Sequence, residues 1–140
     1  MNLIKPYCIF LSLLALLCCS NTKAQSIAAN NSETRVRFIV FTGSDWCPHC
    51  RRFEKNILED SAFKAFAAEH LQMVIADFPQ TRKLLPEQVK QNEALAEQYN
   101  PDGIFPRMVL VNAGSNSYKV IAYSNQSAAE FITLLTAALP

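Results

Sequence analysis

Glycine is scarce in this chain, with three in 140 residues, and tryptophan occurs once. So little glycine excludes a collagen-like chain, and no internal repeat is visible, which argues against a solenoid. An excess of one charge is also missing, because 13 lysine and arginine residues face 12 aspartate and glutamate residues. A nucleic-acid surface or a polybasic membrane patch is therefore not indicated. Half of the residues are hydrophobic, which is typical of one globular domain at this length.

The first 24 residues have the three-part pattern of a secretory signal peptide. A lysine stands near the start, an apolar run follows from Ile9 to Cys19, and a short polar stretch ends at Ala24. The apolar run is shorter than the roughly 20 residues that a membrane-spanning helix needs. We expect cleavage after Ala24 and a periplasmic or secreted protein, with residues 25–34 as a flexible lead-in. Lipid attachment at Cys18 or Cys19 is the alternative, and it would tether the domain to a membrane.

Cysteine becomes scarce once this leader is set aside. Of the five cysteines, Cys8, Cys18 and Cys19 lie in the leader, so the exported domain keeps only Cys47 and Cys50. In an oxidising compartment this pair either closes its own short loop or exchanges electrons with other proteins. A loop so short constrains the unfolded chain little, so a purely stabilising disulfide is disfavoured. The stretch GSDWCPHCRRFE therefore indicates a functional pair.

The hydrophobic pattern predicts an α/β domain over residues 35–140. Strand-like runs cover 35–43, 71–78, 107–112 and 118–123, and helical spacing covers the residues from 47 onward, 61–70, 86–99 and 128–139. Proline 86 and the pair Ser127 and Glu130 are helix-start signals. The helix over 86–99 is expected to turn Val89, Leu95 and Ala96 inward. With the residues from 47 to 70 counted as one helical region, the predicted order is strand, helix, strand, helix, strand, strand, helix.

Disulfide exchange requires that one cysteine of the pair reacts as a thiolate. Cys47 falls at the first turn of a predicted helix, where unpaired N–H groups and the helix dipole favour the anion. We predict that Cys47 is the nucleophile and that Cys50, one turn later, resolves the mixed disulfide. Pro48 suits a first helical turn. His49 either stabilises the Cys47 thiolate or is an exposed residue without a role, and Trp46 either covers the sulfur atoms or belongs to the core.

Metal binding is the main chemical alternative for these cysteines. A structural zinc site needs four ligands, and the exported domain offers two cysteines and two histidines, His49 and His70. His49 lies inside the same short loop as the thiols, and His70 has no histidine partner at the usual spacing. Asp45 and Glu54, on either side of the motif, are expected to be surface charges rather than proton carriers. We therefore expect no metal and no other cofactor.

A C-x-x-C pair at a strand-to-helix junction, in this order of elements, resembles the thioredoxin-like fold over nearly the whole predicted domain. FTGSDWC resembles the active-site approach of small exported thioredoxin-like proteins of bacteria, and CPHC followed by Phe53 and Glu54 is similar to the periplasmic disulfide-forming oxidases. NEALAEQYNPDGIFP resembles the helix and turn that deliver the family's cis-proline, here Pro106. The resemblance implies a mixed sheet of about four strands flanked by helices (βαβαββα). It also implies a substrate surface that includes Trp46, Phe105 and Pro106.

One departure from this resemblance concerns a buried acid. Thioredoxins keep such an acid six residues before the first cysteine, where this chain has Phe41. The internal proton acceptor of the family is therefore missing here or supplied from elsewhere.

The resemblance implies an exported thiol–disulfide oxidoreductase that acts on the cysteines of other exported proteins. A membrane protein is the expected redox partner and a monomer the favoured state. The direction stays open: CPHC favours an oxidase, since potentials run from about −270 mV in thioredoxin to about −120 mV in the disulfide-forming oxidase, whereas the GSDW approach resembles exported reductants. A redox-inert binding module and a copper metallochaperone are the alternative functions, although the latter lacks a well-placed third ligand.

Overall fold

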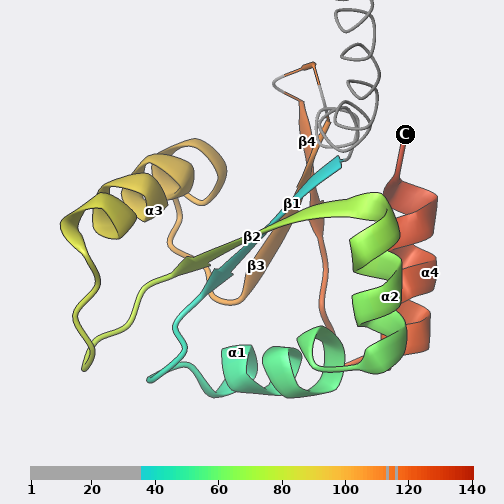
Figure 1. Cartoon of the computed structure of the whole chain (residues 1–140), viewed down its shortest axis with the longest axis horizontal. Coiled ribbons are helices and arrows are strands. Elements are labelled where there is room, and N and C mark those ends of the chain that lie inside the picture. The colour runs from blue at the N-terminus through green and yellow to red at the C-terminus, as the bar shows by residue number, and fades with distance from the viewer. Residues whose placement is uncertain (1–35, 113, 116) are drawn as a thin grey trace, which may run out of the picture. The chain divides into compact units, whose positions relative to one another are not determined.

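The computed structural model describes residues 36–112, 114–115 and 117–140. The predicted leader over 1–24, the lead-in over 25–34, the cleavage site at Ala24 and the alternative lipid sites Cys18 and Cys19 lie outside these residues. Within them the elements are β1 (Val36–Thr42), α1 (Pro48–Phe53), the π-helical turn η1 (Glu54–Leu58), α2 (Ser61–His70), β2 (Leu71–Asp77), α3 (Pro86–Tyr99), β3 (Arg107–Val111), β4 (Tyr118–Ile121) and α4 (Ala128–Ala138). This succession confirms the predicted order of strands and helices (Figure 1).

The strands form one mixed sheet in the order β2-β1-β3-β4 (Figure 1). β1 runs parallel to β2, from Val36 opposite Leu71 to Thr42 opposite Asp77. β3 runs antiparallel to β1, and β4 antiparallel to β3. The C-terminal ends of β1 and β2 and the start of β3 therefore meet at one end of the sheet. The chain around the C-x-x-C motif leaves the sheet at this end.

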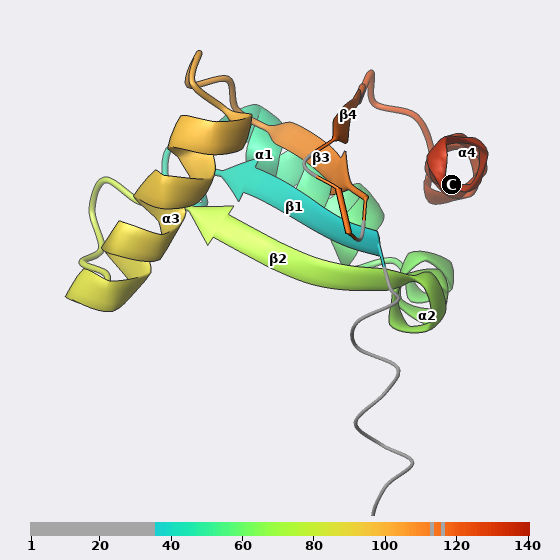
Figure 2. The same ribbon diagram turned by 90° about the horizontal axis from the view of Figure 1, so that it is seen from above.

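The central strand β1 is apolar on both faces because the sheet is covered on both sides. On one side, Phe38 and Val40 pack with residues of α1, η1, α2 and α4. On the other side, Ile39 and Phe41 pack with Val109 and with Tyr99 of α3. Figure 2 shows α3 alone on its side of the sheet and α2 and α4 together on the other. The sheet thus separates two apolar clusters, and the motif lies at the end of the strand that contributes to both.

Two helices begin at the capping residues that the sequence offers. The Asp60 carboxylate accepts the backbone N–H groups of Ala62 and Phe63 at the start of α2. Ser127 and Glu130 form a reciprocal capping box at the start of α4. The backbone N–H of Ser127, followed by its hydroxyl, lowers the pKa of Glu130. These local signals fix where both helices start.

Two details differ from the prediction. The helix after Cys47 does not continue regularly, because η1 inserts a π-helical turn between α1 and α2, and this turn still buries Ile57. The inward orientation predicted for Val89 is wrong, since this residue is 38% exposed. α3 packs on the sheet through Leu95, Ala96 and Tyr99 in its C-terminal half, so its N-terminal half lies away from the core.

Candidate active site

Cys47 and Cys50 are joined by a disulfide whose Cα atoms are 5.2 Å apart. Cys47 is the N-cap residue of α1, and its Sγ accepts the backbone N–H of Cys50 at 3.1 Å. An N–H group that points at this sulfur favours a thiolate there when the pair is reduced. Both residues are buried, with 4% of Cys47 and 1% of Cys50 exposed. Pro48 occupies the first turn of α1, and Pro48 and His49 are exposed.

Trp46 joins two neighbouring segments to the motif. Its indole Nε1 donates a hydrogen bond to the backbone oxygen of Phe78 at 2.7 Å. Its ring packs edge-on against the Phe105 ring with centroids 5.4 Å apart, and Phe105 packs in the same way against Phe78 at 5.5 Å. A Cβ atom at Gly43 would overlap the indole, so glycine is needed where the ring crosses the backbone. Trp46 is thus half-buried in an aromatic cluster beside Cys47, which we call the Trp46 cluster (Trp46, Phe78 and Phe105).

Asp77 is the buried acid of this region, and sequence reasoning missed it. Its carboxylate accepts the backbone N–H of Ser44 at 2.9 Å and the Ser44 hydroxyl at 2.7 Å, and it forms an ion pair with Arg82. Its backbone oxygen accepts the side-chain amide of Asn92 in α3 at 2.7 Å. Asp77 therefore connects the end of β2 to the loop that leads to Cys47. The available signal was an acid at the end of the second strand run, beside the strand that carries the motif.

Asp45 makes the reciprocal connection between the same two loops. Its carboxylate accepts the Thr81 hydroxyl at 2.6 Å and the backbone N–H groups of Gln80 and Thr81 at 2.9 and 2.7 Å. The Thr81 hydroxyl, followed by those N–H groups, holds the pKa of Asp45 well below its usual range. The side chain is a surface charge, as expected, but it also fixes the conformation of the segment after β2.

Pro106 lies between the Trp46 cluster and β3. The Phe105–Pro106 peptide bond is cis. The next residue, Arg107, begins β3 opposite Phe41 and pairs with Asp102 at 3.6 Å. Phe41 is fully buried in the cluster under α3, so an apolar ring fills the position where thioredoxins keep a buried acid. The structure thus brings Trp46, Phe105 and the cysteine pair to the same end of the sheet, with Pro106 directly after Phe105.

His49 stays apart from these contacts. Its side chain takes no hydrogen bond or ion pair with another described residue. Across residues 36–112, 114–115 and 117–140, no group of three or more histidine, cysteine, aspartate or glutamate side chains is arranged to hold a metal ion. The helices in that part of the chain are all too short or too polar to span a membrane.

Three comparisons with known proteins, by family model, by sequence and by structure, agree with one another. A thioredoxin-like family model matches residues 23–113. The disulfide bond reductase DsbH of Chlamydia pneumoniae is 33% identical over 116 residues, which cover 83% of this chain and 69% of that protein. A solved structure of a DsbH oxidoreductase is also 33% identical, with a TM-score of 0.71 over 76% of this chain and 74% of that one. The oxidised C-terminal domain of Neisseria meningitidis DsbD, 17% identical, matches in fold with a TM-score of 0.50 over 76% of this chain and 82% of that one. The predicted fold class is confirmed.

Proposed function

This chain belongs to the thioredoxin-like family and is a thiol–disulfide oxidoreductase, and we propose that it exchanges disulfides with cysteines of exported proteins through Cys47 and Cys50. The observation that carries the proposal is the disulfide itself. It lies at the start of α1, beside the Trp46 cluster, at the end of the sheet where β1 and β2 finish and β3 begins. The predicted domain over residues 35–140 is the unit to which we assign this activity.

The exchange runs in two balanced steps. The Cys47 thiolate attacks one sulfur of a client disulfide, the client S–S bond breaks, and the second client sulfur leaves as a thiolate that takes up a proton. The Cys50 thiol then loses its proton and attacks the Cys47 sulfur of the mixed disulfide. The Cys47–Cys50 bond forms and the first client sulfur is released. Two electrons pass from the protein to the client, and the reverse sequence oxidises a client.

Client contacts are assigned to the surface around the disulfide. Trp46 and Phe105 are half-buried and present aromatic rings beside Cys47, and Pro106 follows directly. We assign the client backbone to Pro106, at the position of the family's cis-proline, and its flanking side chains to the two rings. Pro48 and His49, which lie exposed between the thiols, are assigned to setting the potential.

We assign the reducing direction to this chain, because the relative with 33% identity is named a disulfide bond reductase. The test is the reduction potential of the Cys47–Cys50 pair in equilibrium with glutathione. A value near the roughly −270 mV of thioredoxin agrees with a reductase, and a value near −120 mV overturns this direction in favour of an oxidase. A His49→Ala variant is expected to have a lower potential, because loss of a group that stabilises the thiolate makes the disulfide less oxidising. An unchanged potential would remove His49 from the site.

The proposed location is the periplasm, reached with the signal peptide over residues 1–24. A reductase there needs a membrane protein that returns electrons to the Cys47–Cys50 disulfide. Mass spectrometry of the exported protein tests the leader. A mature chain that starts at Gln25 agrees with cleavage after Ala24, whereas a lipid on Cys18 or Cys19 shows a membrane-tethered protein instead.

Trapping tests the exchange and identifies the partners. In a Cys50→Ser variant the mixed disulfide on Cys47 cannot be resolved, so clients and the electron donor are expected to stay attached until a reductant releases them. The matched control is Cys47→Ser, which keeps one thiol but lacks the nucleophile. If Cys50→Ser captures no exported protein, or if Cys47→Ser captures the same set, the proposed roles of the two cysteines are wrong.

A further inference from the structure

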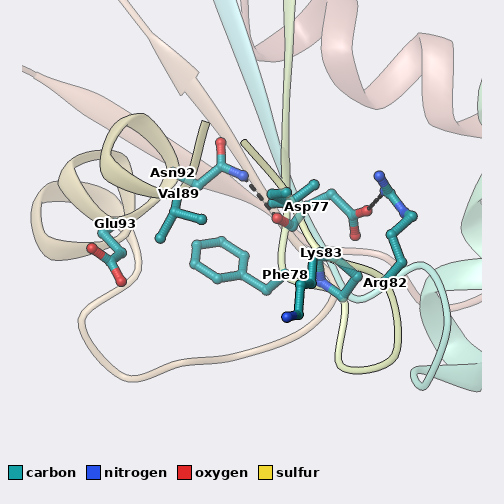
Figure 3. A pocket seen from close by; sticks show the side chains of 9 residues that line it. Asp77, Phe78, Arg82, Lys83, Val89, Asn92 and Glu93 are labelled. Carbon is teal, nitrogen blue, oxygen red and sulfur yellow. Dashed lines mark hydrogen bonds and ion pairs between the residues drawn. The ribbon is translucent and has the colours of Figure 1, made fainter. Parts of the chain in front are cut away.

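A pocket lies between the segment after β2 and helix α3, next to the proposed active site. Its volume is about 340 Å³. Phe78, Pro79 and Leu84 line it from the segment after β2, and Val89 lines it from α3. Figure 3 shows the Phe78 ring pointing toward Val89. We call this cavity the α3 pocket.

The walls of the α3 pocket are held by bonds within the protein. Asn92 of α3 donates to the backbone oxygen of Asp77, and Arg82 pairs with the Asp77 carboxylate, as the dashed lines in Figure 3 mark. The Asp45 carboxylate accepts hydrogen bonds from Gln80 and Thr81 in the same segment. The pocket is therefore formed before a ligand enters, which lowers the entropy lost on binding.

The charges around the pocket select for an uncharged group. Lys83 lies on the loop side and Glu93 on α3 (Figure 3), and neither forms an ion pair with any residue that the structure describes. Their opposite charges offset each other at the rim, and the other two charged lining residues, Asp77 and Arg82, are paired with each other. The larger part of the lining surface is apolar. Beside the pocket, Leu85 is 66% exposed, which extends the apolar surface outward. This chemistry suits an aliphatic or aromatic side chain.

The pocket adjoins the proposed active site through one shared residue, Phe78. The Phe78 ring lines the pocket and also packs against Phe105, and the Phe78 backbone oxygen accepts the Trp46 indole N–H. The α3 pocket and the Trp46 cluster are therefore neighbouring surfaces that share Phe78.

We propose that the α3 pocket binds an apolar side chain of the client polypeptide whose disulfide reacts at Cys47. This subsite rests on the proposed function, because it assumes that the client is a protein. It makes the enzyme prefer cysteines that have an aliphatic or aromatic residue nearby in the same extended segment. Such residues are buried in folded proteins and exposed in unfolded ones, so the preferred clients are incompletely folded chains.

The test uses short synthetic peptides with a single cysteine held as a mixed disulfide with glutathione. One set carries a phenylalanine at successive positions on either side of the cysteine, and the reference peptide carries serine at all of them. The second-order rate constant of reduced wild-type protein is expected to be about tenfold higher for the best phenylalanine peptide than for the serine peptide, a factor that corresponds to about 1.4 kcal/mol.

The variant Val89→Glu places a charge in the pocket wall near the N-terminus of α3, where an acidic residue is compatible with the helix. It is expected to remove the preference for phenylalanine. The matched control is Val120→Glu, which should keep the preference. Val120 is 52% exposed and lies on β4, the edge strand on the other side of the sheet from β2.

Equal rates for all peptides with wild-type protein, or a preference that survives in Val89→Glu, overturn the subsite and leave the exchange function standing. A loss of preference in Val120→Glu as well also overturns the assignment to this pocket. If no peptide is reduced by the wild-type protein, the proposed function itself has failed.

Discussion

Replacing Asp77 with alanine removes the only side chain that accepts both the N–H and the hydroxyl of Ser44 among the described residues. The Asp77 side chain is 12% exposed, so the two lost bonds are largely shielded from water. A hydrogen bond to a charged group contributes about 1.5–3 kcal/mol. Taking the lower end for each, because the Ser44 groups are only partly buried, Asp77→Ala should lower the free energy of unfolding by about 3 kcal/mol.

The ion pair between Asp77 and Arg82 should contribute little to this loss. The Arg82 side chain is 57% exposed, and exposed pairs contribute about 0–1 kcal/mol. Arg82→Ala is therefore the matched control, with an expected loss below about 1 kcal/mol. Ser44→Ala removes one of the two bonds and should lie between the two, at about 1.5 kcal/mol.

Urea unfolding of the oxidised proteins, followed by circular dichroism, measures these free energies. Because Ser44 and Asp77 contact each other, the double variant should lose less than the sum of the single losses, by about 1 kcal/mol or more. The reasoning fails if Arg82→Ala costs as much as Asp77→Ala, or if the Ser44 and Asp77 losses simply add. Either result would mean that the ion pair or the backbone, and not the bond to Ser44, holds the loop before Cys47.

Two further predictions concern the same loop. Gly43→Ala should displace the overlapping indole of Trp46, break its bond to Phe78 and shift the fluorescence of this single tryptophan to longer wavelength, and an unshifted spectrum would contradict the close approach. Asp45→Asn should lower stability at neutral pH, because the folded state lowers the pKa of Asp45. The difference from wild type in urea titrations should shrink as the pH falls below about 4 and would be constant if Asp45 contributed nothing.

The elements and the cysteine pair were predictable because their signals are local. Hydrophobic runs gave the strands, and residues such as Asp60 and Ser127 gave helix starts through bonds to N–H groups two or three residues away. The C-x-x-C spacing likewise lies within four residues of sequence.

The connections around the pair were not predictable, because they join residues far apart in sequence. Ser44 and Asp77 are 33 residues apart, and Asp45 and Thr81 are 36 apart. Nothing in the pattern near Asp45 distinguishes a carboxylate that accepts three donors from a solvated one. The inward orientation predicted for Val89 was wrong for a related reason. Helical periodicity shows which side of a helix is apolar, but not that only one half of the helix reaches the sheet.

Pro48 and His49, which we propose to set the reduction potential, are both exposed. The bonds that fix the loop lie before Cys47, at Ser44, Asp45 and Trp46, and they end on the segment after β2. The dipeptide between the cysteines can therefore be exchanged without repacking the core. Under the proposed role of the dipeptide, we expect a series of such variants to form a graded set of electron donors and acceptors on one unchanged scaffold.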